Sequence, residues 1–224
     1  MAAKVKVVAY AAVLIVVLPL LAAWLVRVSS QYTGFDLETH RALWFLITFS
    51  LWVSLTIAVT YFASKAGIPF RCFPITIKFG SRAELQQVIR YSIVLIFFEI
   101  FLLFLPDFVP INQALRLPPS RYNLLIPHGS VMDFLAVATL VVGIPVIEEI
   151  VVRGLILSQL ITVFRIWPAI IISTVMWTGM HAEGWIPIFA IGVLNAFATI
   201  RTRSLVPAIV AHIGVEFIAV YLSL

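Results

Sequence analysis

Apolar runs of about twenty residues follow one another along the 224-residue chain, separated by short polar segments. A run of this length is long enough to cross the roughly 30 Å hydrocarbon core of a bilayer as one helix. The composition agrees, because 62% of the residues are hydrophobic and only 11% are charged, against about 45–50% and 25% in an average soluble domain. The sequence therefore predicts an all-α fold, a polytopic membrane helix bundle of about seven transmembrane helices.

The boundaries of the seven spans follow from the helix-start and helix-stop signals between the runs. We expect spans at residues 7–28, 42–64, 81–105, 130–158, 168–181, 187–200 and 204–224. The third begins with Ser81-Arg82-Ala83-Glu84, a capping box. Gly143 and Pro145 are expected to bend the fourth. We expect residues 1–130 to form an N-terminal membrane unit of helices one to three with their loops, and residues 131–224 to form a second unit of helices four to seven.

Basic residues are unevenly distributed between the two sides of this arrangement. If the N-terminus lies inside, the inner side holds Lys4, Lys6, Lys65, Arg71, Lys78, Arg82, Arg90, Arg165, Arg201 and Arg203, and the outer side holds Arg27, Arg41, Arg116 and Arg121. The positive-inside rule thus predicts an inner N-terminus and an outer C-terminus. Since the net charge of +5 is spread over these loops, it sets orientation and does not indicate nucleic-acid binding. One cysteine, Cys72, excludes an intramolecular disulfide framework.

Glu148 and Glu149 stand side by side inside the fourth apolar run, and Arg153 follows four residues after the second glutamate. An ionised carboxylate at the bilayer centre costs at least ~2.5 kcal/mol, so both glutamates need partners or a function. On a helix Glu149 and Arg153 share a face and can form an ion pair, whereas Glu148 points about 100° away. One interpretation is a structural salt bridge with a spare carboxylate. The other interpretation is that Arg153 holds Glu149 in place while Glu148 takes part in a reaction.

Two histidines lie at comparable depth on other spans. His181 closes the fifth span, where Trp177 four residues earlier can pack on its ring, and His212 shares a face of the seventh span with Glu216. The simpler interpretations are an interfacial residue for His181 and a helix–helix contact for the His212–Glu216 pair.

Two further polar residues lie deep in apolar runs. Asn195 in the sixth span is interpreted as a helix–helix contact. Glu99 in the third span has two interpretations, pairing with Arg153 or a position near the inner cavity, and the sequence does not choose between them.

The depths of Glu148, His181 and His212 agree. Counted at ~1.5 Å per residue from the inner ends of their helices, the three lie ~15, ~20 and ~12 Å into the membrane. Helix tilt can absorb a difference of about 8 Å. One glutamate and two histidines from three helices can therefore meet in one buried site. Two histidines and one glutamate are also a common set of protein ligands for zinc, and they leave one coordination position open for water.

The polar residues of the last four spans resemble the motifs of a known family. They read Glu148-Glu149-x-x-x-Arg153, Trp177-x-x-x-His181 and His212-x-x-x-Glu216. This set, with the segment Arg203–His212, resembles the motifs of the CAAX protease and bacteriocin-processing family, also called CPBP or Abi, of intramembrane proteases. The resemblance covers roughly residues 131–224. In two departures, Trp177 replaces the usual Phe, a mild change, and Glu216 replaces the usual Asn, which in the family helps to form the oxyanion site.

The resemblance implies an intramembrane endopeptidase, a hydrolase that cleaves membrane-adjacent segments of other proteins: C-terminal tails, prenylated peptides or leader peptides. The partners it implies are a membrane protein or lipidated peptide as substrate and the lipid bilayer, with no nucleic acid. It assigns Glu148 as the general base that activates water, His181 as the residue that completes the catalytic site and His212 as the group that stabilises the scissile carbonyl. Supporting positions are Glu149, Arg153, Trp177, Asn195 and Glu216.

The sequence does not decide whether the site holds a metal ion. The family has been described both as metalloendopeptidases and as glutamate-dependent, metal-free proteases. A zinc ion held by Glu148, His181 and His212 and a metal-free site both satisfy the sequence.

Two other function classes compete with the protease. A proton-coupled transporter subunit would use the same glutamates and histidines as a relay, but the spans show no paired broken-helix repeat. A non-catalytic membrane scaffold or immunity protein that kept the fold would explain Glu216 in place of Asn.

Overall fold

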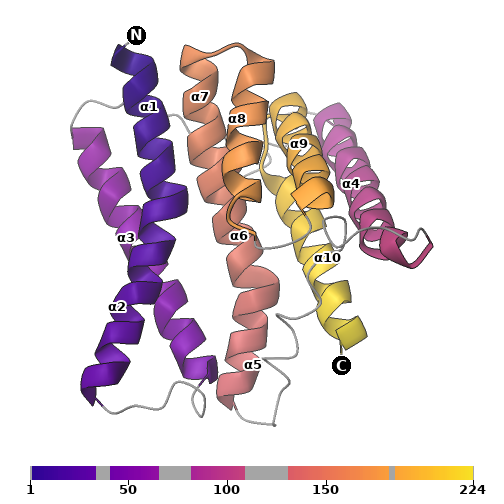
Figure 1. The fold of residues 1–224 in the computed structure, drawn as a ribbon. Helices are drawn as coiled ribbons and strands as arrows, with labels where there is room; N and C mark the ends of the chain where they lie inside the picture. The colour runs from indigo at the N-terminus through magenta and orange to yellow at the C-terminus, as the bar shows by residue number, and fades with distance from the viewer. Residues whose placement is uncertain (1, 34–40, 66–81, 109–130, 182–184, 224) are drawn as a thin grey trace.

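The computed structural model describes residues 2–33, 41–65, 82–108, 131–181 and 185–223. In these ranges every regular element is a helix, which confirms the predicted all-α fold (Figure 1). The elements are α1 (Ala2–Ala12), η1 (Val13–Val17), α2 (Leu18–Thr33), α3 (Arg41–Lys65), α4 (Arg82–Phe108), α5 (Val131–Ala138), η4 (Thr139–Gly143), α6 (Ile144–Glu149), η5 (Ile150–Leu157), α7 (Ser158–Val163), α8 (Ile166–Thr178), α9 (Trp185–Thr202) and α10 (Val206–Ser223).

Four helical segments in the described part of the chain are long and apolar enough to cross a membrane. They are Leu43–Lys65, Arg82–Leu102, Phe134–Val163 and Trp185–Thr202, and two shorter apolar helices cover Ile166–Thr178 and Val206–Val220. The chain is therefore an integral membrane protein. The number of seven transmembrane helices and the inward orientation of the N-terminus stay predictions.

The break after α7 lies between the fourth and the fifth predicted span, at Phe164 and Arg165. Phe164 and Arg165 both have extended backbone, so the chain reverses there and α8 begins at Ile166. At the other end, α8 stops at Thr178, three residues earlier than predicted. The amide of His181 donates to the carbonyl of Thr178 over 3.0 Å. This turn places His181 just beyond the helix, and the prediction that the fifth span includes His181 is wrong.

The two glutamates lie in α6, which has a π-helical segment on each side. The preceding one, η4, ends at Gly143, and η5 begins directly after Glu149. Pro145 follows Gly143 inside a continuous helical stretch, where proline has no N–H to donate to the preceding turn. A side chain at Gly143 would meet the ring of Phe49 from α3 at 3.3 Å, so glycine allows α3 to approach. Such π segments are frequent at functional sites.

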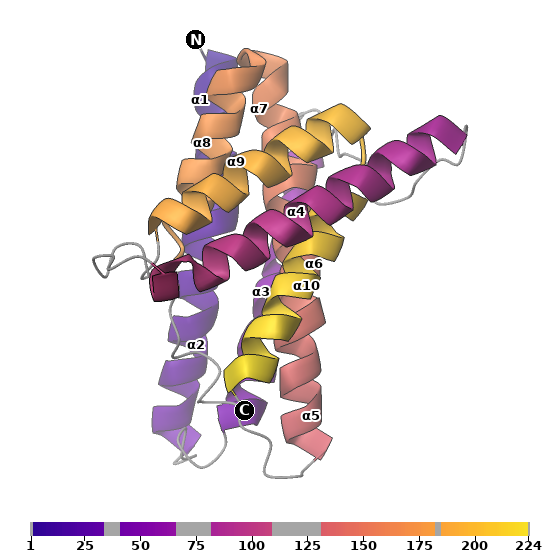
Figure 2. The same cartoon turned by 90° about the vertical axis from the view of Figure 1, so that its right-hand side faces the viewer.

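The elements α5 to α7 form one long rod, and the later helices assemble on it. Helix α10 packs against α6, α8 packs against both η5 and α9, and α4 packs against α10 and α9. Seen from the side, α4 and α9 run obliquely across this rod (Figure 2). This arrangement brings α4, whose sequence carries no motif, next to the helix that carries His212.

Candidate active site

Arg153 and Glu149 form a buried ion pair. The Nη1 atom of Arg153 lies 3.1 Å from Oε1 of Glu149, and the two side chains are 1% and 0% exposed. The guanidinium carbon of Arg153 also lies 4.2 Å from the centre of the Trp177 ring, a cation–π contact. The contact predicted from the i,i+4 spacing is confirmed. Because both charges are matched and shielded from lipid, the pair can be kept inside the membrane.

Trp177 connects the glutamate helix to α8. Its indole N–H donates to Oε2 of the buried Glu148 over 2.8 Å. The ring fits because α9 carries Gly192 opposite it; a Cβ there would come within 3.0 Å of Trp177 Cε3 and 2.7 Å of Thr174 Cγ2. Sequence reasoning treated tryptophan in place of phenylalanine as a mild change. The structure gives the change a consequence, since phenylalanine has no N–H to donate.

His212 contacts Glu149. Its Nδ1 lies 3.2 Å from Oε1 of Glu149, the same oxygen that Arg153 contacts, and its ring meets the Trp177 ring edge-on at 5.8 Å. A carboxylate only accepts, so the hydrogen is on Nδ1. The other nitrogen, Nε2, lies 4.0 Å from Oε1 of Glu216 on the same helix. Glu216 therefore reaches His212, as the i,i+4 spacing predicted.

His181 is held in a similar way from the end of α8. Its Nδ1 lies 3.0 Å from the carbonyl oxygen of Trp177, which fixes the hydrogen on Nδ1 and leaves the lone pair on Nε2. The rings of His181 and Trp177 meet edge-on at 5.0 Å, which confirms the predicted packing of these two side chains. Both histidines thus carry a hydrogen on Nδ1.

Trp177 is the residue on which the site converges. Its ring or its N–H contacts Glu148, Arg153, His181 and His212, which come from three separate stretches of the chain. The structure therefore brings the predicted residues of all three motifs around one side chain. Their catalytic roles stay predictions.

A zinc site made of Glu148, His181 and His212 stays a prediction. In the part of the chain that the structure describes, no group of three or more His, Cys, Asp or Glu side chains is placed to hold a metal ion. Glu148 directs one oxygen to the indole, and both histidines direct Nδ1 to oxygen acceptors. With Nδ1 on an oxygen acceptor in both rings, Nε2 is the nitrogen that a metal ion would contact.

Glu99 and Asn195 lie side by side behind this site. Both side chains are completely buried, Glu99 on α4 and Asn195 on α9. Glu99 interacts electrostatically with His212, Glu149 and Arg153. Among the described residues Glu99 forms no hydrogen bond with Arg153, so the predicted pairing of the two is not confirmed.

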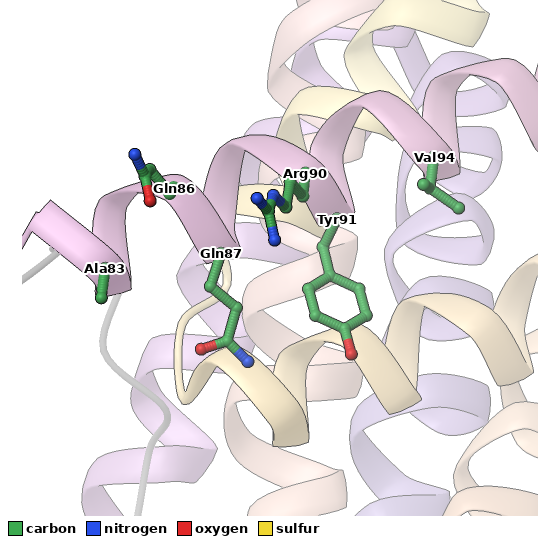
Figure 3. A pocket seen from close by; sticks show the side chains of 6 residues that line it. All are labelled: Ala83, Gln86, Gln87, Arg90, Tyr91 and Val94. Atoms are coloured by element: carbon green, nitrogen blue, oxygen red, sulfur yellow. The ribbon is translucent and has the colours of Figure 1, made fainter.

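Two surface hollows are separate from the motif residues. One, of about 460 Å³, lies between α3 and the glutamate helix and is lined by Thr56, Ile57, Thr60, Tyr61, Ser64, Ile147, Ile150, Val151 and Leu155. The other, of about 560 Å³, lies along the first turns of α4 (Figure 3). There Gln87 and Tyr91 extend from the same side of the helix, and Gln87 Nε2 donates to the carbonyl of Arg201 over 3.3 Å.

Comparison with known proteins gives one match. Residues 130–218 match the family model described as type II CAAX prenyl endopeptidase Rce1-like. No curated protein and no solved structure matches the chain. The matched segment is less than half of the chain, and it contains all three motifs, from Glu148 to Glu216. The resemblance seen in the motifs is thereby confirmed for residues 130–218, which are similar to the Rce1-like type II CAAX prenyl endopeptidases.

Proposed function

We propose that this protein is an intramembrane endopeptidase in which Glu148 activates the hydrolytic water. The observation that carries the proposal is the position of Glu148. Its carboxylate is buried and held by the indole N–H of Trp177, whose ring also contacts both histidines, inside the segment that matches an endopeptidase family.

The two neighbouring glutamates have different surroundings, which supports Glu148 as the base. Oε1 of Glu149 contacts both Arg153 and His212, so this carboxylate is committed to two cationic or donor groups. Glu148 accepts from the indole N–H of Trp177, which orients the carboxylate. A general base must be oriented and still able to take a proton. Glu148 meets that requirement better than Glu149.

The histidines supply the second requirement of hydrolysis, which is stabilisation of the oxyanion. With Nδ1 of His212 held by Glu149, Nε2 is the nitrogen that can address a substrate carbonyl; in the protonated ring it donates to the developing oxyanion. His181 Nε2 carries a lone pair and can accept a hydrogen bond from the attacking water.

The proposed reaction balances without a covalent intermediate. Glu148 takes a proton from water as the water oxygen forms a bond to the peptide carbonyl carbon. The carbonyl oxygen becomes an oxyanion next to His212. The C–N bond then breaks, and Glu148 returns its proton to the amine, giving a carboxylate and a free amino terminus.

The substrate class follows from the location of the site and from the family. A site among membrane-spanning helices favours a substrate segment that itself lies in or beside the bilayer. We therefore propose the C-terminal segment of a lipid-anchored or membrane-bound protein as substrate, with a prenylated peptide as the first compound to test. Non-prenylated C-terminal tails and leader peptides are the alternatives.

The test is cleavage of a prenylated CAAX peptide by the purified protein in lipid nanodiscs. A single turnover in ¹⁸O-labelled water should place the label in the new carboxyl group of the product. E148Q should abolish cleavage, whereas E84Q, the same change at an exposed position of α4, should not. An unlabelled first product would show direct attack by a carboxylate, and full activity of E148Q would refute Glu148 as the base.

The same variants separate the protease from its main rival. If the prenylated peptide, an unmodified tail and a leader peptide all remain intact, while the protein in vesicles shows proton flux that E148Q removes, the transporter is correct. Cleavage without proton flux supports the protease.

A further inference from the structure

Glu99 is a carboxyl group that neither the family motifs nor the proposed reaction uses. It lies on α4, outside the matched residues 130–218. Its side chain is completely buried, and neither of its oxygens has a hydrogen-bond partner among the described residues. The same holds for both amide atoms of Asn195 and for the hydroxyl of Thr199, which are also completely buried.

The neighbours of Glu99 are the charged residues of the site. Its electrostatic partners are His212, Glu149 and Arg153, and Asn195 lies beside it without a hydrogen bond of standard geometry. The packing of α4 against α10 and α9 creates this proximity, because α10 carries His212 and α9 carries Asn195. Glu99 is thus part of the wall behind His212.

A structural role does not explain why a glutamate occupies this position. Arg153 already has a counter-charge in Glu149 at 3.1 Å, although neither of its terminal nitrogens has a hydrogen bond of standard geometry among the described residues. A buried polar group without a partner lowers stability compared with an apolar one of similar size. Residues that are unfavourable for the fold tend to be kept at functional sites, and an ionisable residue inside a membrane is such a case.

Resting on the proposed function, we infer that Glu99 is a positioning residue of the active site that supports His212 from α4. The carboxylate stabilises the positive charge that His212 carries while it donates to the oxyanion. His212 then has Glu99 as a further carboxylate beside Glu149, which it contacts at 3.2 Å and which also pairs with Arg153. In a low-dielectric interior such an interaction acts over several ångströms, so direct contact is not required. The site therefore extends into the third predicted span, beyond the family segment.

The experiment compares E99Q, E99D and the matched control E84Q on the same helix. Kinetic constants are measured with the prenylated peptide in nanodiscs, and thermal unfolding is measured in parallel. E99Q keeps the shape and removes the charge, so kcat should fall ~10- to 100-fold, as for other residues that act through a functional side chain. KM should stay unchanged, and Tm should stay the same or rise. E99D keeps the charge and should lose less kcat than E99Q.

Three outcomes overturn the inference. The first is wild-type kcat in E99Q, and the second is a kcat loss in E99Q that follows a fall in Tm, as a purely structural role predicts. The third is equal loss in E99Q and E99D, which would remove charge as the cause. The E148Q variant distinguishes a failure of this inference from a failure of the proposed function. An inactive E148Q with a fully active E99Q refutes Glu99 alone, whereas an active E148Q refutes the general base.

Discussion

Helix α3 and the continuous rod from α5 to α7 look alike by hydropathy and differ in what surrounds them. Their most apolar windows have mean hydropathies of 1.9 and 2.2, yet 11% of the first and 44% of the second is buried inside the protein. Helix α3 exposes large apolar side chains such as Ile57 and Phe62, whereas the rod carries Glu148, Glu149 and Arg153 in buried positions. Charged residues are thus found where protein, not lipid, forms the surroundings.

The buried share of helix α4 lies between those of α3 and of the rod, and its charged residue Glu99 is again on the buried side. Of its apolar window 28% is buried. Phe97 and Phe101 are exposed on one side, and Glu99 between them is completely buried on the other. One face of this helix therefore contacts lipid and the other contributes to the charged cluster. The comparison predicts that polar substitutions matter according to burial and not according to depth in the membrane.

The largest effect on stability is expected from R153A. It leaves the completely buried Glu149 without its nearest cation, and breaking a buried pair costs ~3–5 kcal/mol. Thermal unfolding in detergent should show a large fall in Tm together with loss of cleavage. The matched control is R90A on α4, where the side chain is exposed and the expected change is within ~0.5 kcal/mol. Equal stability of the two variants would contradict the contrast between buried and exposed charges.

W177F is expected to change stability less than R153A and to lower activity selectively. The ring is kept, but the N–H that holds Glu148 over 2.8 Å is lost. Leaving a buried acceptor without its donor costs ~1–3 kcal/mol, so kcat should fall ~5- to 100-fold with a modest change in Tm. W167F makes the same change at an exposed position of the same helix and should be neutral. Unchanged kcat in W177F would show that the indole does not orient the base.

The smallest effect is expected from E216Q. Glu216 is 24% exposed, and its Oε1 lies 4.0 Å from His212 Nε2. A partly exposed ion pair of this length contributes less than ~1 kcal/mol. Activity should hold or rise, because glutamine supplies a donor where a carboxylate would repel the oxyanion. A fall in kcat of more than about tenfold, measured with the same peptide, would instead assign Glu216 to orienting the imidazole.

The contacts within one helix could be predicted from the sequence, and the contacts between helices could not. Helical geometry fixes which residues share a face. The pairs Glu149–Arg153, Trp177–His181 and His212–Glu216 were accordingly predicted and are confirmed. The family resemblance was also visible in these spacings.

Contacts across helices depend on which faces pack, and no local spacing encodes that. The bond from Trp177 to Glu148 and the contact of His212 with Glu149 are of this kind. Gly192, which makes room for Trp177, gave no signal in the sequence. The burial of Glu99 behind His212 likewise follows from the packing of α4 on α10. The division of the chain into a unit of residues 1–130 and a unit of residues 131–224 stays a prediction.

The most direct test of the account compares E148Q with E149Q, two identical changes at adjacent residues. The account assigns chemistry to Glu148 and support of Arg153 and His212 to Glu149. E148Q should lower kcat by ~10²–10⁴-fold, the range of general-base catalysis, with Tm close to that of the unmodified protein. E149Q should lower the free energy of unfolding by ~3–5 kcal/mol, because it leaves Arg153 buried without its counter-charge. A destabilised E148Q beside a stable and inactive E149Q would reverse the assignment and contradict the account.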